Sequence, residues 1–192
     1  MAGIEELKSI VSKRGGVARA NLYRVDLPPI PNSPLSTSEL NILCSAAQLP
    51  GRMLGSHDKI IGSFNQKIAY SEIHEDINLS FTVMNDYGIR KYFEQWQSLV
   101  LNKDTYEIGY ILGPNGYGRT VKIHQLKKGI GLPIFSNPFI DIDLYTRDQI
   151  VYSVELQEAY PINIGSIELS DASASEAIQM TVQLSYRKWK TL

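Results

Sequence analysis

The stretch from Ile77 to Asn102 constrains the fold most, because its hydrophobic period changes from two residues to about 3.6. Its first half alternates and predicts a half-buried strand with a polar side made of Asn78, Ser80 and Thr82. Asn85 and Asp86 can accept the free N–H groups of a first helical turn. The second half places its apolar side chains on one helical stripe: Ile89, Tyr92, Phe93, Trp96, Leu99 and Val100. We expect an amphipathic helix that packs this stripe against a sheet.

Period-two alternation recurs along the chain and predicts a mainly β, α+β protein. The expected strands are Asn21–Ile30, Leu40–Leu49, Lys59–Tyr70, Thr105–Leu112, Thr120–Leu126, Ile140–Leu144, Ile150–Glu158, Ile164–Leu169 and Ile178–Tyr186. Asp171–Glu176 predicts a polar turn. The expected architecture is an antiparallel β-sandwich or barrel with one flanking amphipathic helix. Residues 1–192 are expected to form a single domain.

Two segments extend beyond this pattern. Residues 1–16 form an N-terminal helix or arm, since Met1–Lys13 has apolar residues at helical spacing and Gly15 with Gly16 can end a helix. Such a short helix is marginal alone, so it docks on its own domain or awaits a neighbour. Residues 113–139 form a loop-rich insert, with Gly and Pro frequent in Gly129–Phe139.

Composition excludes several classes of function. The 19 basic and 20 acidic residues nearly balance, so the charge gives no case for tight nucleic-acid binding. Cys44 is the one cysteine, which excludes an intrachain disulfide and fits a reducing compartment. No apolar run reaches the roughly 18 residues of a membrane span, and no signal peptide is visible. We expect a soluble intracellular product without a membrane partner.

No motif proposes catalysis, a metal or a cofactor. The three histidines, His57, His74 and His124, lie in separate segments and lack the spacing of a helical metal site. Asp141 and Asp143 could bind calcium, but their alternation with Ile140 and Ile142 is explained more simply by the polar face of a strand. The glycine-rich residues 113–118 lack the Lys-Ser/Thr of a phosphate-binding loop. The sequence thus predicts a non-enzyme without cofactors.

The polar strand faces are similar in kind. Besides the three residues above, Ser153, Glu155 and Gln157 form a second set, and Gln179, Thr181, Gln183 and Ser185 a third. Most are uncharged hydrogen-bonding side chains. An ordinary solvated sheet face explains them. The alternative is the lining of a channel for a polyanion, which must be wet without a dense row of cations, because each phosphate contact adds affinity.

Three stretches resemble, in order, the tail tube proteins of contractile-tailed bacteriophages of the T-even type. They are CSAAQLPG at Cys44–Gly51, FTVMND followed by a helix ending in FEQWQSLV, and the strand pair within Leu156–Tyr186. Together they cover a little under half of the chain.

This resemblance implies hexameric rings in which each subunit gives four strands to one inner barrel. The rings stack into a tube through which DNA passes without specific binding. The implied partners are further copies of the chain, the tail sheath protein, the baseplate tube initiator and the tape measure protein. The implied location is the virion tail, assembled in the host cytoplasm. All ten polar residues above are then expected to face the lumen.

Two other interpretations stay open. The related baseplate protein that initiates the tube has a similar strand and helix, and type VI secretion tube proteins share the architecture. From another class, a monomeric ligand-binding β-sandwich, such as a carbohydrate-binding module, explains the same strands.

Overall fold

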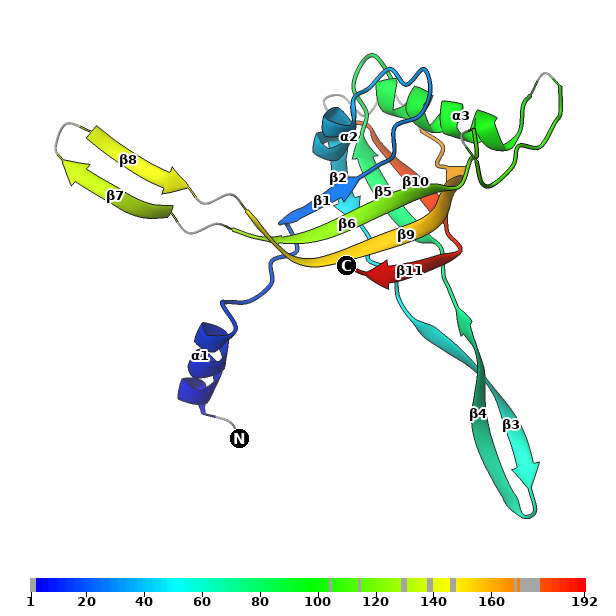
Figure 1. The fold of residues 1–192 in the computed structure, drawn as a ribbon, viewed down its shortest axis with the longest axis horizontal. Coiled ribbons are helices and arrows are strands. Elements are labelled where there is room, and N and C mark those ends of the chain that lie inside the picture. The colour runs from blue at the N-terminus through cyan, green and yellow to red at the C-terminus, as the bar shows by residue number, and fades with distance from the viewer. Residues whose placement is uncertain are drawn as a thin grey trace. The chain divides into compact units, whose positions relative to one another are not determined.

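The computed structural model describes residues 3–103, 105–113, 115–128, 131–137, 140–145, 148–167, 169 and 177–192. Its helices are α1 (Ile4–Lys13), α2 (Thr37–Leu43) and α3 (Gly88–Val100). The turn expected at Asp171–Glu176 lies outside the described residues. The fold is mainly β, with antiparallel sheets and few helices, as the sequence predicts (Figure 1). The described strands form open sheets and not a closed barrel.

Seven strands form the main sheet, in the order β1-β6-β9-β10-β5-β2, with β11 also paired to β9. Their bounds are β1 Tyr23–Asp26, β2 Cys44–Ala47, β5 Ile77–Thr82, β6 Arg119–Lys127, β9 Gln149–Ile164, β10 Gln179–Ser185 and β11 Lys188–Thr191. Figure 1 shows β6 and β11 on either side of β9. The core strands β5 and β10 pair antiparallel from Ile77 opposite Leu184 to Thr82 opposite Gln179.

The sixteen-residue strand β9 pairs with different strands along its length. Its residues 154–157 pair with β11, and its residues 160–164 pair with β10. Between the two stretches Glu158 has a φ of 55°, in the left-handed region of backbone conformation. The sequence prediction of two strands here, Ile150–Glu158 and Ile164–Leu169, is wrong, since one strand runs through residues 159–163. Proline has no backbone N–H to donate to the partner strand. The strand continues through Pro161 because the β9–β10 ladder shifts register there, between Gln183 and Leu184 of β10, and an irregular position tolerates the missing donor.

Two hairpins form separate two-stranded sheets. Strands β3 (Met53–Ile61) and β4 (Phe64–Ile73) replace the single strand expected at Lys59–Tyr70, because Gly62 adopts a φ of 66° and reverses the chain. Strand β8 (Ile140–Tyr145) lies where the strand Ile140–Leu144 was expected. It pairs with β7 (Gly131–Asn137), in a part of the insert where a loop was expected. A register shift between Pro133 and Phe135 accommodates the proline.

Two further expectations are wrong. The segment Leu40–Leu49 begins in helix α2, since Ser36 and Glu39 form a capping box in which the Ser36 N–H donates to the Glu39 carboxylate at 2.7 Å. Thr105–Leu112 contributes only an isolated bridge between Ile108 and Leu101 in its described residues. There the Tyr106 N–H donates to the Asn102 carbonyl at 2.8 Å, which makes a turn.

Helix α3 covers one face of the β5–β10 pair with aromatic side chains. Tyr92, Phe93 and Trp96 are fully buried, and the Phe93 and Phe81 rings lie 5.1 Å apart. Ile89 is also buried, whereas Leu99 and Val100 at the last turn are half-buried. Asp86 accepts the Gly88 N–H at 3.2 Å at the helix start, where Tyr87 has a φ of 53°.

Two side-chain hydrogen bonds fix α3, the first buried and the second part-buried. The Tyr92 hydroxyl donates to the Pro28 carbonyl at 2.6 Å, and the Trp96 ring N–H donates to the Tyr117 carbonyl at 2.8 Å. Each bond satisfies a polar atom that would otherwise be costly to bury. The aromatic stripe thus holds the helix in one position as well as supplying apolar area.

The chain divides into two compact units. One comprises Met1–Arg24 and His124–Tyr152, and the other comprises Val25–Ile123 and Ser153–Leu192. The second unit contains α3, the β5–β10 pair and the hairpin of β3 and β4. The expected single domain stays a prediction.

Candidate functional site

The face of β5 and β10 opposite α3 gathers polar side chains in register. Asn78 lies opposite Gln183, Ser80 opposite Thr181, and Thr82 opposite Gln179. The Ser80 and Thr181 hydroxyls are hydrogen-bonded at 3.3 Å. These six residues and Ser185 are exposed or half-buried. The structure therefore brings seven of the ten polar residues singled out in the sequence onto two neighbouring strands.

The same strands are apolar on their other side. Ile77, Leu79 and Phe81 of β5 and Met180, Val182 and Leu184 of β10 are at most 1% exposed. One face thus lies against the protein core while the other meets water, so the alternation fixes which side chains are available to a partner.

Neighbouring side chains hold the polar face in place. The Gln48 side-chain carbonyl accepts from the Asn78 backbone N–H at 3.2 Å and from its side-chain amide at 3.4 Å. The Gln183 amide donates to Asp76 at 3.4 Å. Four of the seven polar residues, Asn78, Ser80, Thr181 and Gln183, thus have hydrogen-bond partners within or beside the face.

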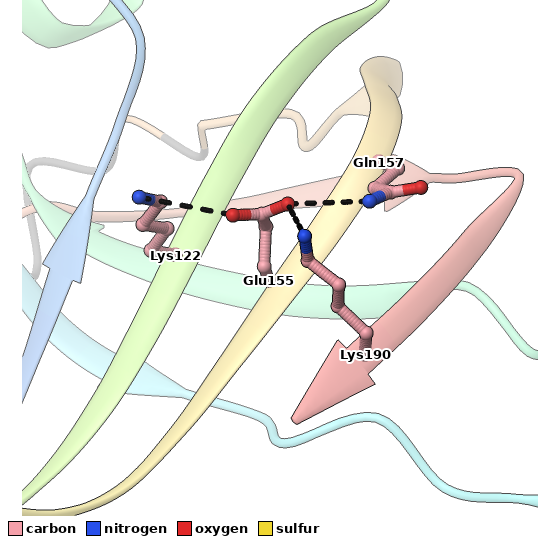
Figure 2. Close-up of polar contacts among 4 residues, drawn as sticks. All are labelled: Lys122, Glu155, Gln157 and Lys190. Carbon is pink, nitrogen blue, oxygen red and sulfur yellow. Dashed lines mark hydrogen bonds and ion pairs between the residues drawn. The ribbon is translucent and has the colours of Figure 1, made fainter. Parts of the chain in front are cut away.

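The other three residues lie in the half of β9 that pairs with β11. Ser153 is buried, at 6% exposure, while Glu155 and Gln157 are half-buried. Figure 2 shows Glu155 between Lys122 of β6 and Lys190 of β11. Its carboxylate lies 3.0 Å from the Lys190 ammonium and 3.7 Å from that of Lys122.

The negative charge of Glu155 lies between the positive charges of Lys122 and Lys190. The hydrogen bond from Lys190, another from Gln157 at 3.2 Å, and the charges of Lys190 and Lys122 hold the pKa of Glu155 below its ordinary value. Neither Lys122 nor Lys190 was predicted from the sequence as part of a site. The alternation of Lys188, Trp189 and Lys190 is a short polar-apolar-polar pattern that is typical of a strand. It could have predicted β11, the strand that carries Lys190.

Catalytic chemistry finds little support in the described part of the chain. Its residues contain no group of three or more side chains suited to hold a metal ion. Burial raises the pKa of the Cys44 thiol to about 11, so the thiol stays protonated. Among the described helices, none has the length and hydropathy needed to cross a membrane. The polar sheet face is the candidate site that the structure does define.

The chain is similar to proteins of phage tails and of contractile injection systems. Residues 18–192 match a family model described as phage tail tube protein. A chain of the anti-feeding prophage baseplate aligns with a TM-score of 0.59 at 15% identity, covering 92% of this chain and 95% of that one. A chain of an extracellular contractile injection system, from its sheath-tube complex in the extended state, gives 0.57 at 10% identity, with 100% and 99% covered. The search of curated proteins gave no significant match.

A third solved structure is the anti-feeding prophage cap, described as a tube-terminating cap. One of its chains gives a TM-score of 0.56 at 10% identity, with 92% of this chain and 91% of that chain covered. At these identities the three likenesses show a shared fold.

Proposed function

This chain belongs to the phage tail tube protein family, and we propose that it assembles into hexameric rings that stack into a hollow conduit for DNA. The proposal makes the protein a structural subunit of the tail tube and not an enzyme. The proposed partners are other copies, the surrounding sheath, the baseplate initiator and the tape measure protein. The proposed location is the virion tail, after assembly in the host cytoplasm.

A four-stranded, one-sided sheet carries this proposal. Strands β9, β10, β5 and β2 are consecutive neighbours and all pair antiparallel. Helix α3 covers one face of the central pair, which leaves the polar face for a lumen. Since β2 ends the sheet order, a second subunit could extend the ladder there and remove an open edge.

The dimensions of such a ring suit double-stranded DNA. Six copies of a four-stranded sheet give about 24 strands. At about 4.8 Å per strand and a tilt of about 40°, their circumference is roughly 150 Å and the backbone diameter about 48 Å. After inward side chains are subtracted, a duplex still fits. The described strands of a single subunit form open sheets and enclose no such channel, so the proposed function requires assembly.

The electrostatics of the face support passage without binding. The seven residues on β5 and β10 are uncharged. Near β9, the cations of Lys122 and Lys190 are paired with Glu155 and are less available to phosphate. We propose a lumen lined by the nine exposed or half-buried residues; Ser153, being buried, supports the wall instead.

Electron microscopy of the purified protein at high concentration tests the proposal. Stacked rings with an open lumen are the expected result, with light scattering on the same sample to follow their length. Single rings that never stack favour the tube initiator instead. A monomer at every concentration, including after addition of a preformed baseplate, refutes the tube and favours a ligand-binding module.

The lumen assignment has its own test. The double substitution Gln179→Lys with Gln183→Lys adds twelve cations to each hexameric ring and should slow DNA exit from particles, more strongly at low salt. The matched control, Ser98→Lys with Thr105→Lys, adds the same charge at exposed positions on and after α3. Equal ejection rates for both variants would disprove the assignment while leaving assembly itself unaffected.

A further inference from the structure

A basic pocket of about 490 Å³ lies where the segment after α1 meets β6. Its lining contains four cations and no carboxylate: Arg14, Arg19, Lys127 and Lys128. Among the described residues, none of these four cations forms an ion pair. Like charges gathered in one place repel, so an anionic occupant would stabilise the pocket.

Hydrogen bonds to the main chain form the wall of the basic pocket. The Gln125 side-chain amide donates to the Arg19 carbonyl at 2.7 Å and to the Leu22 carbonyl at 2.9 Å. Gly15 has a φ of 75°, and a Cβ at this position would lie 2.6 Å from the Lys127 ammonium nitrogen, so this cation lies against the turn after α1. The wall therefore depends on the carbonyl of Arg19 and not on its guanidinium group.

The basic pocket also has an apolar lining, which includes Val17, Leu22, Leu126 and Val151. Val17 is 75% exposed and Val151 is 62% exposed. A phosphate backbone would match the cations but would leave these apolar side chains in water. A peptide that carries carboxylates beside an apolar side chain matches both features. The volume lies within the ~300–1,000 Å³ of ordinary ligand sites, so the pocket favours an acidic peptide segment.

The connection between β9 and β10, residues 165–178, has this composition. It contains the carboxylates Glu168, Asp171 and Glu176 and no lysine or arginine. Leu169, which is 75% exposed, stands between the first two. Strands β9 and β10 are antiparallel neighbours that a turn of about two to five residues could join, whereas this connection runs from the end of β9 at Ile164 to the start of β10 at Gln179. Joining the strands does not explain its length.

Other carboxylates of the chain match the basic pocket less well. Glu5 and Glu6 on α1 share their helix with Lys8, which lies 3.5 Å from Glu5. Asp76 already accepts a hydrogen bond from Gln183 at 3.4 Å. The β9–β10 connection is therefore the better occupant, because its charges have a single sign.

The two compact units carry opposite net charge. The unit of Met1–Arg24 and His124–Tyr152, which contains the basic pocket, has eight basic and five acidic residues. The unit that contains the β9–β10 connection has 11 basic and 15 acidic residues. Opposite charges on different surfaces favour association of one copy with another. In a single chain, the extended strand β9 separates Val151 from the connection, which also favours the pocket of another copy.

We propose that the β9–β10 connection of one copy docks in the basic pocket of a second copy. Leu169 then contacts the apolar lining, and Glu168 and Asp171 lie beside the cations. This inference rests on the proposed assembly of copies into tubes. The contact joins different surfaces of the two chains, so it can repeat from copy to copy.

Disulfide trapping in assembled tubes tests the contact. The variant Val17→Cys with Leu169→Cys replaces two exposed side chains, and the native Cys44 is buried and protonated. Mild oxidation should give a ladder of dimers and higher species on a denaturing gel without reductant. The matched control, Val17→Cys with Tyr110→Cys, places the second thiol at an exposed position outside the connection and should give little ladder. If circular dichroism shows that Val17→Cys misfolds, Ala18→Cys in the same pocket replaces it.

A charge exchange tests the electrostatic part of the contact. In the trapping variant, Arg19→Glu with Lys128→Glu should lower the yield of cross-links by roughly threefold to tenfold. Adding Glu168→Lys with Asp171→Lys should restore the yield, because the opposite charges then face each other with their positions exchanged.

A matched control makes the same charge change elsewhere. Lys59→Glu with Lys67→Glu alters two exposed residues of the hairpin of β3 and β4 and should leave the yield unchanged. An equal loss of cross-links in this control, or no recovery after the charge exchange, would show that the pocket does not recognise the connection.

Other outcomes also overturn the contact. Intact tubes without cross-links exclude it, and a disulfide within one monomer would place the connection on its own chain. A labelled DNA duplex that binds tubes through Arg19 and Lys128, in the absence of cross-links, would assign the pocket to phosphate instead. If the unsubstituted protein forms no tubes, the proposed function fails together with this contact; if it forms tubes that do not cross-link, only this contact fails.

Discussion

Removal of one hydroxyl, in Tyr92→Phe, should destabilise the unit that contains α3 without changing its shape. The Tyr92 side chain is fully buried, and its hydroxyl donates to the buried Pro28 carbonyl over 2.6 Å. The substitution removes this donor from the buried carbonyl, which costs about 1–3 kcal/mol of unfolding free energy.

Urea unfolding followed by tryptophan fluorescence measures this cost. Trp96 packs against Tyr92 with ring centroids 6.0 Å apart, so its emission reports on α3. With a urea m-value of about 2 kcal/mol per molar, the midpoint should fall by roughly 0.5–1.5 M at unchanged slope. The measurement belongs at low protein concentration, because assembly adds stability by mass action.

The matched control is Tyr110→Phe. Tyr110 is 87% exposed, so loss of its hydroxyl should shift the free energy of unfolding by less than about 0.5 kcal/mol. If both variants unfold at the same urea concentration, the buried hydrogen bond contributes nothing and the account of how α3 is fixed is wrong.

Three further outcomes can be measured on the same protein. The pKa of Glu155 is lowered mainly by the hydrogen bond from Lys190, so the stability that its carboxylate contributes is present above the unfolded pKa of about 4.3 and is lost as the pH falls through the folded pKa. Glu155→Gln should lower the free energy of unfolding at pH 7 by up to about 1 kcal/mol, and unfolding measured against pH should show a smaller loss of stability in acid than the unsubstituted protein shows. The Cys44 thiol, with its pKa raised to about 11 by burial, should react with a thiol reagent at pH 8 only as fast as the chain opens, so rapid reaction without urea would contradict its burial. Gly109→Ala should cost about 1–3 kcal/mol in thermal unfolding, because the added carbon would overlap the Leu99 carbonyl oxygen, and an unchanged melting temperature would contradict that close approach.

The elements predicted well from the sequence are those whose pattern depends on a single buried face. The strand at Ile77–Thr82 and the helix at Gly88–Val100 appear where the period changes, because burial on one side dictates both. The residues Tyr92, Phe93 and Trp96 follow directly from the helical stripe. For the same reason the polar side of β5 and β10 could be assigned, although its use as a lumen is a proposal.

Errors arose where local signals compete with pairing. The capping box of Ser36 and Glu39 was present in the sequence and starts α2, but the apolar run after it favoured a strand. The strand β7 contains Pro133, whose composition favoured a loop, and only a partner strand with a register shift makes it a hairpin. The cluster around Glu155 joins three strands distant in sequence, so no local pattern could predict it.

The pairing of β5 with β10 sets the order in which this protein can be made. Thr82 and its partner Gln179 are separated by about a hundred residues, which a ribosome adds in roughly 5–20 s. Throughout that interval β5 lacks its neighbour β10. The sheet that carries the polar face therefore closes only after β10 has been synthesised, so a chain truncated before residue 179 should be unable to form it or to join a ring.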